Sequence, residues 1–186
     1  MNLPNKLTLM RIILIPVFLL IMVLPLEFGS VAWLGTVTPV TWIVATVIFA
    51  VAAVTDFLDG HIARSRHLVT NFGKFADPLA DKMLVMTAFI ILVANHIVPA
   101  WVAAIIVCRE LAVTGLRLIV AETSGQVIAA AWPGKIKTAT QMFSIIGLLL
   151  RFNSIGLILL YVCLFFTVYS GIDYFVKNWG VFAHSI

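Results

Sequence analysis

Long apolar stretches separated by short polar connections form the main pattern of this chain. Most of the stretches approach the roughly 20 residues that an α-helix needs to cross a bilayer. We therefore predict an all-α integral membrane protein in which six transmembrane helices form one bundle. The whole chain, residues 1–186, is then a single membrane domain with a short juxtamembrane segment at about residues 1–8. The apolar runs cover residues 8–26, 39–58, 79–95, 99–121, 136–150 and 155–176.

Composition supports a membrane protein. Hydrophobic residues make up 62% of the chain and charged residues only 11%, with a mean hydropathy of +1.12. A soluble domain of this length carries more charge. The first run follows Lys6 and Arg11 as in a signal peptide, but it lacks a small-residue cleavage site and leads into further apolar runs, so we interpret it as a retained helix.

The basic residues gather on alternate connections. The connections at residues 27–38, 95–99 and 151–154 contribute only Arg151. By the positive-inside rule, both termini and the connection between the second and third helices are expected on the cytoplasmic side. The basic residues on that side are Lys6, Arg11, Arg64, Arg66, Lys74, Lys82, Arg117, Lys135, Lys137 and Lys177.

Four of the eight acidic residues lie close together around that second connection. A charged side chain at the centre of a membrane helix costs about 2.5 to 3.5 kcal/mol, so such a cluster needs compensation. At about 100° per helical residue, the first two acids share a face, and the last two, four residues apart, share another. Two helices can thus direct four carboxylates to one point. These residues are Asp56, Asp59, Asp77 and Asp81.

Divalent cations are the natural compensation for such a cluster. Four adjacent carboxylates repel one another unless cations lie between them, and two Mg²⁺ or Mn²⁺ ions would balance their charge. A pair of metal ions is suited to holding a diphosphate, and Arg64 to binding its phosphate charge. Two simpler alternatives stay open. Asp77 before Pro78 also fits a helix N-cap, and Arg64 also fits a marker of the helix end.

The motif itself is more specific than its parts. It reads D-x2-D-G-x2-A-R-x8-G-x3-D-x3-D, and it resembles the signature of the CDP-alcohol phosphatidyltransferase family at every specified position. The resemblance implies a six-helix membrane enzyme, usually a homodimer, with two divalent ions at the cytoplasmic side. It also implies residue roles: Asp56, Asp59 and Asp77 as metal ligands, Asp81 as metal ligand and general base, and Asp56, Gly60, Ala63 and Arg64 as contacts of the cytidine nucleotide and its diphosphate.

Three other segments indicate the acceptor. The segments N-L-P-N-K-L-T-L-M-R, R-E-x3-T-G-x-R and G-K-x-K-T resemble the family members that use glycerol-3-phosphate. The implied reaction moves a phosphatidyl group from CDP-diacylglycerol to sn-glycerol-3-phosphate and releases CMP, as a step of phospholipid biosynthesis. The implied location is the bacterial cytoplasmic membrane, with several passes and contact with membrane lipid. No nucleic-acid partner is expected.

Basic residues support an anionic acceptor. Arg109 lies within an apolar run, where an unpaired cation is costly, and its neighbour Glu110 points about 100° away. With Arg117, Lys135 and Lys137 it could form a cradle for the acceptor's phosphate. The alternative is that Arg109 has a structural partner and the others only mark the cytoplasmic side.

Weaker candidates and rival functions remain. Asn5, Thr8 and Arg11 recur every three residues, and substrate binding explains this stripe no better than helix capping or surface anchoring. One rival is the same donor with another acceptor, such as inositol phosphate, phosphatidylglycerol or serine. More distant rivals are a cation transporter and a structural membrane subunit. A transporter would favour charges near the bilayer midplane and repeated halves, whereas these acids cluster around one connection and the sequence shows no repeat.

Overall fold

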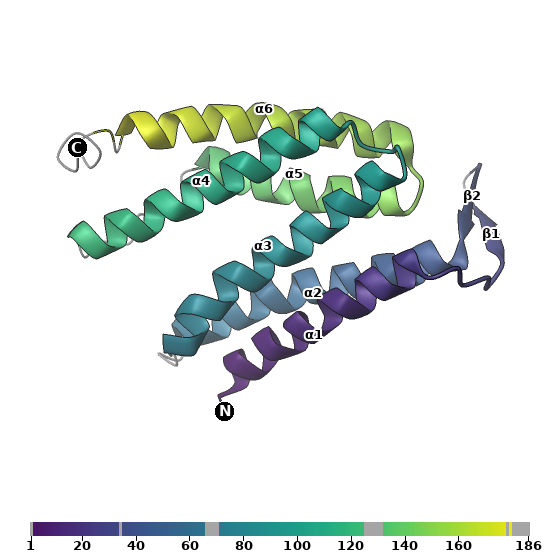
Figure 1. Ribbon diagram of the computed structural model, residues 1–186, viewed down its shortest axis with the longest axis horizontal. Helices are drawn as coiled ribbons and strands as arrows, with labels where there is room; N and C mark the ends of the chain where they lie inside the picture. The colour runs from purple at the N-terminus through teal and green to yellow at the C-terminus, as the bar shows by residue number, and fades with distance from the viewer. Residues whose placement is uncertain (1, 34, 66–70, 125–131, 178, 180–186) are drawn as a thin grey trace.

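The computed structural model describes residues 2–33, 35–65, 71–124, 132–177 and 179. Some helical side chains, including those of residues 56–65, 71–75, 77 and 78, lie outside the described part. Within it there are six α-helices and one hairpin (Figure 1), which confirms the mainly helical prediction. The elements are α1 (Leu3–Val23), β1 (Ser30–Trp33), β2 (Thr36–Pro39), α2 (Val40–Ser65), α3 (Asn71–Ala94), α4 (Ala100–Ser124), α5 (Trp132–Leu149) and α6 (Asn153–Lys177).

Each predicted apolar run corresponds to one helix, but several helices extend beyond it. The helix α2 continues to Ser65 and α3 begins at Asn71, so both include the polar motif that flanks their connection. Two described helices are apolar and long enough to cross a membrane by length and composition, Asn5–Val23 and Asn153–Lys177. The charged residues within α3, α4 and α5 lower the hydropathy of those helices.

The surface of the bundle is apolar while several polar groups lie inside. Ile90, Phe143 and Phe165 are 66%, 65% and 65% exposed, whereas Arg11 and Glu110 are buried. Exposing so much apolar surface to water would be unfavourable, at roughly 25 cal/mol for each Å². The distribution suits a protein surrounded by lipid.

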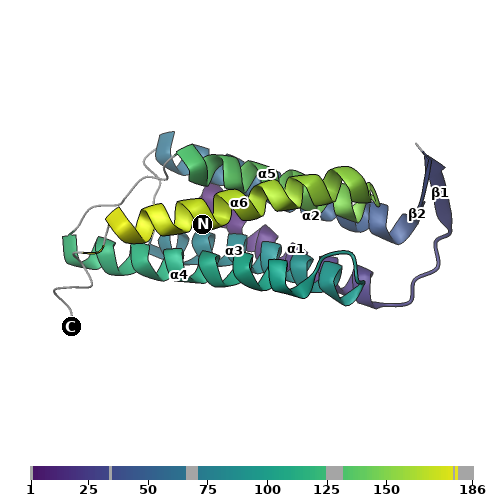
Figure 2. The same cartoon turned by 90° about the horizontal axis from the view of Figure 1, so that it is seen from above.

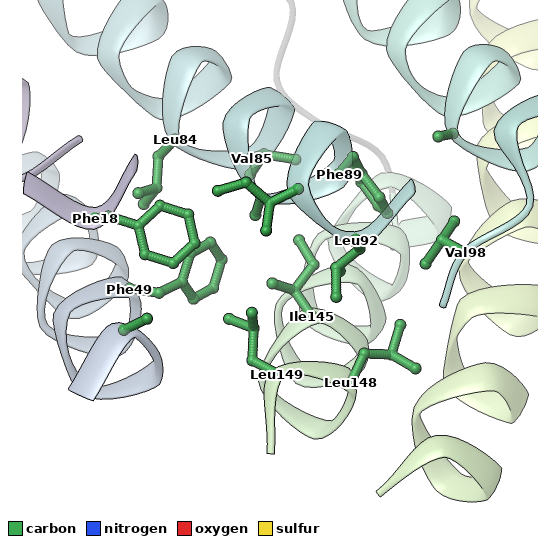
Figure 3. Packing of buried hydrophobic residues seen from close by; sticks show 14 of the residues in the cluster. Phe18, Phe49, Leu84, Val85, Phe89, Leu92, Val98, Ile145, Leu148 and Leu149 are labelled. Carbon is green, nitrogen blue, oxygen red and sulfur yellow. The ribbon is translucent and has the colours of Figure 1, made fainter. Parts of the chain in front are cut away.

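The helix α3 lies at the centre of the hydrophobic core. Phe18 of α1 and Phe49 of α2 meet at a ring-centroid distance of 6.1 Å and pack beside Leu84 of α3 (Figure 3). Further along α3, Leu92 packs beside Ile145 of α5. Because α3 contacts both halves of the bundle, any side chain that it carries is held relative to both.

Both ends of the chain's helical part lie at one end of the bundle. Figures 1 and 2 show that α1 begins, and α4 and α6 end, opposite the hairpin. The helix α2 ends and α3 begins at this same end (Figure 1). This arrangement agrees with termini on a shared side, and the side of the membrane that they face stays a prediction.

The sequence does not predict the hairpin, because residues 27–38 are expected to form only a connection between two helices. Gly29 and Gly35 have φ of +80° and +79°, values that residues with a Cβ rarely adopt. Strand β1 pairs with β2 from Ser30 opposite Pro39 to Trp33 opposite Thr36. Two strands of four residues give too short an alternation to be detected in an apolar sequence.

Arg151, the basic residue on the sparsely charged side, has a structural partner. Its guanidinium lies 3.9 Å from the centroid of the Trp42 ring, and burial lowers the pKa of Arg151 below its ordinary value. A cation over an indole face is attracted by the ring's quadrupole. Its contact with Trp42 therefore explains the exception to the charge pattern.

Helices α5 and α6 come into close contact at two glycines. A Cβ on Gly147 would lie 3.5 Å from the Cα of Gly156, and Ser144 Oγ donates a hydrogen bond of 2.8 Å to the carbonyl of Gly156. Small residues allow helix backbones to approach in this way in membranes. The pair therefore sets the spacing of α5 and α6.

We expect Gly156→Ala to destabilise the bundle. The new Cβ would lie 2.6 Å from Leu148 Cδ2 and 3.0 Å from the Leu148 backbone nitrogen. Overpacking of this kind costs about 1 to 3 kcal/mol. The measurement is the thermal unfolding midpoint in detergent. Gly115→Ala is the matched control, because no atom of the described residues lies within 4 Å of the Cβ it would add. Equal midpoints for the two variants would contradict the close contact.

Candidate active site

The four acids of the motif lie on the two helices that flank one connection. Asp56 and Asp59 are in α2 and Asp77 and Asp81 in α3, and these helices contact each other. The helical geometry assumed in the spacing argument is therefore present. The side chains of the first three acids, and of Gly60, Ala63 and Arg64, lie outside the described part. Among the described side chains, no group of three His, Cys, Asp or Glu residues forms a metal site, so the metal site stays a prediction.

A chain of ion pairs extends from Asp81 through the bundle. Lys82 Nζ lies 3.1 Å from Asp81 Oδ2 and 2.6 Å from Glu110 Oε2. The other oxygen of Glu110, Oε1, is paired with Lys137 Nζ. Four charges of alternating sign thus join α3, α4 and α5.

This ion-pair chain is deeply placed. Glu110 and Lys137 are 4% and 3% exposed, so little water screens their interaction. The four residues line one small cavity together with Gln141, whose Nε2 has no hydrogen-bond partner in the described part of the chain. Removing one member of a buried ion pair leaves the other uncompensated, which is strongly unfavourable.

Arg109 faces away from Glu110, as the helical geometry predicts. Its Nη2 donates a hydrogen bond of 2.8 Å to Ser170 Oγ on α6. A Cβ on Gly171 would lie 3.2 Å from Arg109 Cγ, so the glycine leaves room for the arginine side chain. The structural partner considered as an alternative is therefore present, and it leaves other guanidinium nitrogens able to bind a ligand.

The other predicted cradle residues lie around the same helices. Arg117 is 5.4 Å from the centroid of the Tyr174 ring, and Lys135 is 5.2 Å from that of Trp132. Arg109 is near enough to both Arg117 and Lys137 for their charges to repel one another. Three of the predicted cations thus act on one another electrostatically, whereas Lys135 lies beside an exposed aromatic ring at the start of α5.

The N-terminal stripe faces the bundle. Thr8 and Arg11 are fully buried, and Arg11 Nε donates a hydrogen bond of 3.3 Å to the carbonyl of Ala52 on α2. Ala52 precedes Asp56 by one helical turn. Arg11 thus brings a positive charge close to the acidic motif. Asn5, at the start of the stripe, is half-buried.

Reasoning from the sequence missed part of this site. Lys82 was interpreted only as a topology marker, Glu110 only as a neighbour of Arg109, and Gln141 and Ser170 were not considered. The available signal was a set of polar residues inside apolar runs, which are costly unless paired. Their partners come from other helices, and spacing along one helix does not reveal them.

Comparison with known proteins agrees with the motif. The profile of the CDP-alcohol phosphatidyltransferase family matches residues 1–169. This chain belongs to that family. It is 49% identical to the CDP-diacylglycerol--glycerol-3-phosphate 3-phosphatidyltransferase of Bacillus subtilis (strain 168), over 96% of this chain and 95% of that protein.

Other relatives in the CDP-alcohol phosphatidyltransferase family bear the same name. The protein of Haemophilus influenzae is 38% identical over 93% of this chain and 91% of its own length. That of Shigella flexneri serotype 5b is 40% identical over 93% and 92%. The similarity therefore covers the acidic motif together with the basic residues of α4 and α5.

We expect Glu110→Ala to destabilise this family member severely. The change would leave Lys82 and Lys137 without their shared carboxylate, and breaking a buried pair costs about 3 to 5 kcal/mol. Denaturation in detergent with urea would measure it. The control is Asp173→Ala, which breaks the partly exposed pair of Asp173 with Lys177 on α6 and should cost about 0 to 1 kcal/mol. Similar losses for both variants would contradict the role of burial.

Proposed function

We propose that this chain transfers a phosphatidyl group from CDP-diacylglycerol to sn-glycerol-3-phosphate, giving phosphatidylglycerophosphate and CMP. The observation that carries the proposal is the placement of Asp81 beside a group of cations from neighbouring helices. Lys82 forms an ion pair with Asp81. Lys137 is attracted electrostatically by Asp81 and repelled by Arg109. A carboxylate that accepts a proton and cations that hold a phosphate are the two groups that this acceptor requires. The names of the full-length relatives support the same substrates.

The donor half of the site is assigned to the acidic motif. Asp56, Asp59, Asp77 and Asp81 would hold two Mg²⁺ or Mn²⁺ ions, since carboxylate oxygens on two contacting helices suit these metals. When bound, the ions neutralise the negative charge of the diphosphate. Asp56, Gly60, Ala63 and Arg64 would contact the nucleotide and its diphosphate. The small residues at two of these positions leave room beside the backbone of α2.

The acceptor half is assigned to the cations of α4 and α5. Arg109, Arg117, Lys135 and Lys137 would bind the phosphate of glycerol-3-phosphate, and Asp81 would accept the proton of its primary hydroxyl during attack on the lipid-side phosphorus. Ser170 would hold Arg109 in position. The hydroxyl and the phosphate of the acceptor lie at opposite ends of a three-carbon chain, which matches a base on α3 and cations on the adjoining helices.

The membrane arrangement belongs to the same proposal. We infer a six-span bundle in the bacterial cytoplasmic membrane, with both termini and the site on the cytoplasmic side, acting as a homodimer in contact with lipid. The apolar outer surface and the shared end of the termini support the bundle and its topology. Both substrates could then reach the site, the lipid from the membrane and glycerol-3-phosphate from the cytoplasm.

An acceptor panel tests the reaction. With CDP-diacylglycerol and Mg²⁺ or Mn²⁺, the purified protein should release CMP with sn-glycerol-3-phosphate and not with inositol phosphate, phosphatidylglycerol or serine. A chelator should abolish release, and either metal should restore it, because the diphosphate would lose its counter-ions. CMP release with a different acceptor would overturn the acceptor assignment, and undiminished release in chelator would overturn the metal assignment.

The base is tested by Asp81→Asn. The amide cannot accept the proton, so we expect kcat to fall by about 10² to 10⁴ at saturating metal and substrates. CMP release in mixed micelles measures the change. Asp173→Asn, the same substitution at the ion pair with Lys177 on α6, is the control and should retain wild-type kcat. Near wild-type turnover by Asp81→Asn would refute the role of Asp81.

A further inference from the structure

Lys137 is already occupied by an anion of the protein itself. The proposed function has Lys137 bind the acceptor's phosphate, yet its side chain is paired with Glu110 and only 3% of the residue is exposed. Glu110 as a residue is 4% exposed, so both charges lie away from water. A phosphate that reached Lys137 beside this carboxylate would be repelled by it at close range. Lys137 therefore binds phosphate only if the Glu110 carboxylate moves away from it.

Glu110 has a second partner that makes this exchange possible. Its Oε2 is 2.6 Å from Lys82 Nζ, and Lys82 is held in turn by Asp81 at 3.1 Å. A carboxylate that releases Lys137 thus keeps its ion pair with Lys82 and is not left uncompensated.

The same cavity holds a hydrogen-bond donor without a partner. Gln141 is 2% exposed, and its Nε2 donates to no described residue, although it lines the cavity with Glu110, Lys137 and Lys82. Buried amide donors are nearly always satisfied. An oxygen of a phosphate held by Lys137 would satisfy it, whereas the carboxylate of Glu110 does not.

We propose that Glu110 is a resident counter-anion of the acceptor site: it occupies Lys137 until the acceptor's phosphate displaces it, and it returns to displace the phosphate of the product. This inference rests on the proposed function. The reaction takes place at the acceptor's hydroxyl, so the same phosphate monoester is present in glycerol-3-phosphate and in phosphatidylglycerophosphate. A carboxylate that competes for Lys137 weakens the binding of both and so prevents the product from being retained.

The exchange follows from charge. A phosphate monoester carries close to two negative charges and three acceptor oxygens, whereas the carboxylate carries one charge and two oxygens. Arg109, whose charge acts on Lys137, adds to the attraction of the phosphate. At a high acceptor concentration the phosphate therefore displaces the Glu110 carboxylate from Lys137. When the phosphate dissociates, the carboxylate pairs with Lys137 again. Glu110 is a positioning residue here, because it acts through Lys137 and contacts no reacting atom.

The test is Glu110→Gln, which removes the competing charge and keeps an oxygen that accepts a hydrogen bond from either lysine. We expect the KM for glycerol-3-phosphate to fall by about tenfold, on the scale of close charge pairs at buried contacts. The inhibition constants of inorganic phosphate and of phosphatidylglycerophosphate should fall in parallel. All three are measured by CMP release at saturating CDP-diacylglycerol. A merely structural role of Glu110 would leave these constants unchanged or raise them, and either result overturns the proposal.

Asp173→Asn is the matched control for the loss of one negative charge. Its pair with Lys177 lies on α6 outside the cavity, so the KM and both inhibition constants should stay at wild-type values. A parallel fall in this control would mean that the whole-protein charge, and not the contact with Lys137, sets phosphate affinity. That result would also overturn the proposal.

Lys82→Met gives an answer even if Glu110→Gln does not fold. This change leaves the pair of Glu110 with Lys137 intact but removes the second partner of the carboxylate. A displaced Glu110 carboxylate would then lack a second cation, so phosphate would bind Lys137 less well. The inhibition constant of inorganic phosphate should rise by about tenfold. An unchanged or lower constant would refute the exchange. Failure of the wild-type protein to use glycerol-3-phosphate would instead refute the proposed function, so the two failures are distinguishable.

Discussion

The ion pairs of Glu110 with Lys82 and Lys137 are the contact on which the polar interior depends. They join three helices that also contribute residues to the hydrophobic core. An ion pair shielded from water loses much of its energy when its atoms separate, since few water molecules are present to replace the partner. The registers of α3, α4 and α5 are therefore coupled through one carboxylate. The same carboxylate lies between the base candidate Asp81 and the cations of α4 and α5.

The hydrophobic core fixes the positions of the helices that carry these ion pairs. Phe18 and Phe49 hold α1 and α2 against one side of α3, while Ile145 of α5 packs on the other. The close contact of Gly147 with Gly156 fixes α6 relative to α5. Arg109 is held in turn by its hydrogen bond to Ser170 on α6. Residues far from the chemistry thus determine how far the cations lie from α3.

Much of the site was accessible from the sequence, for identifiable reasons. The acids at Asp56, Asp59, Asp77 and Asp81 are close in sequence, and the structure places them on two helices that contact each other, as the spacing predicts. The different directions of Arg109 and Glu110 follow from about 100° per residue, and the structure confirms them, because the two side chains contact different helices. The hairpin was missed because glycine turns at Gly29 and Gly35 leave little periodic signal in so short a segment.

The sequence by itself determined the class of protein, the positions of the helices and the acidic motif, because hydropathy and helical spacing are local properties. Only the tertiary structure decided the partners of the buried charges. Glu110 could have paired with any cation on a neighbouring helix, and Lys137 looked like a free phosphate ligand until its carboxylate partner was located. Pairing across helices depends on how the apolar faces pack, and that packing is a property of the whole bundle.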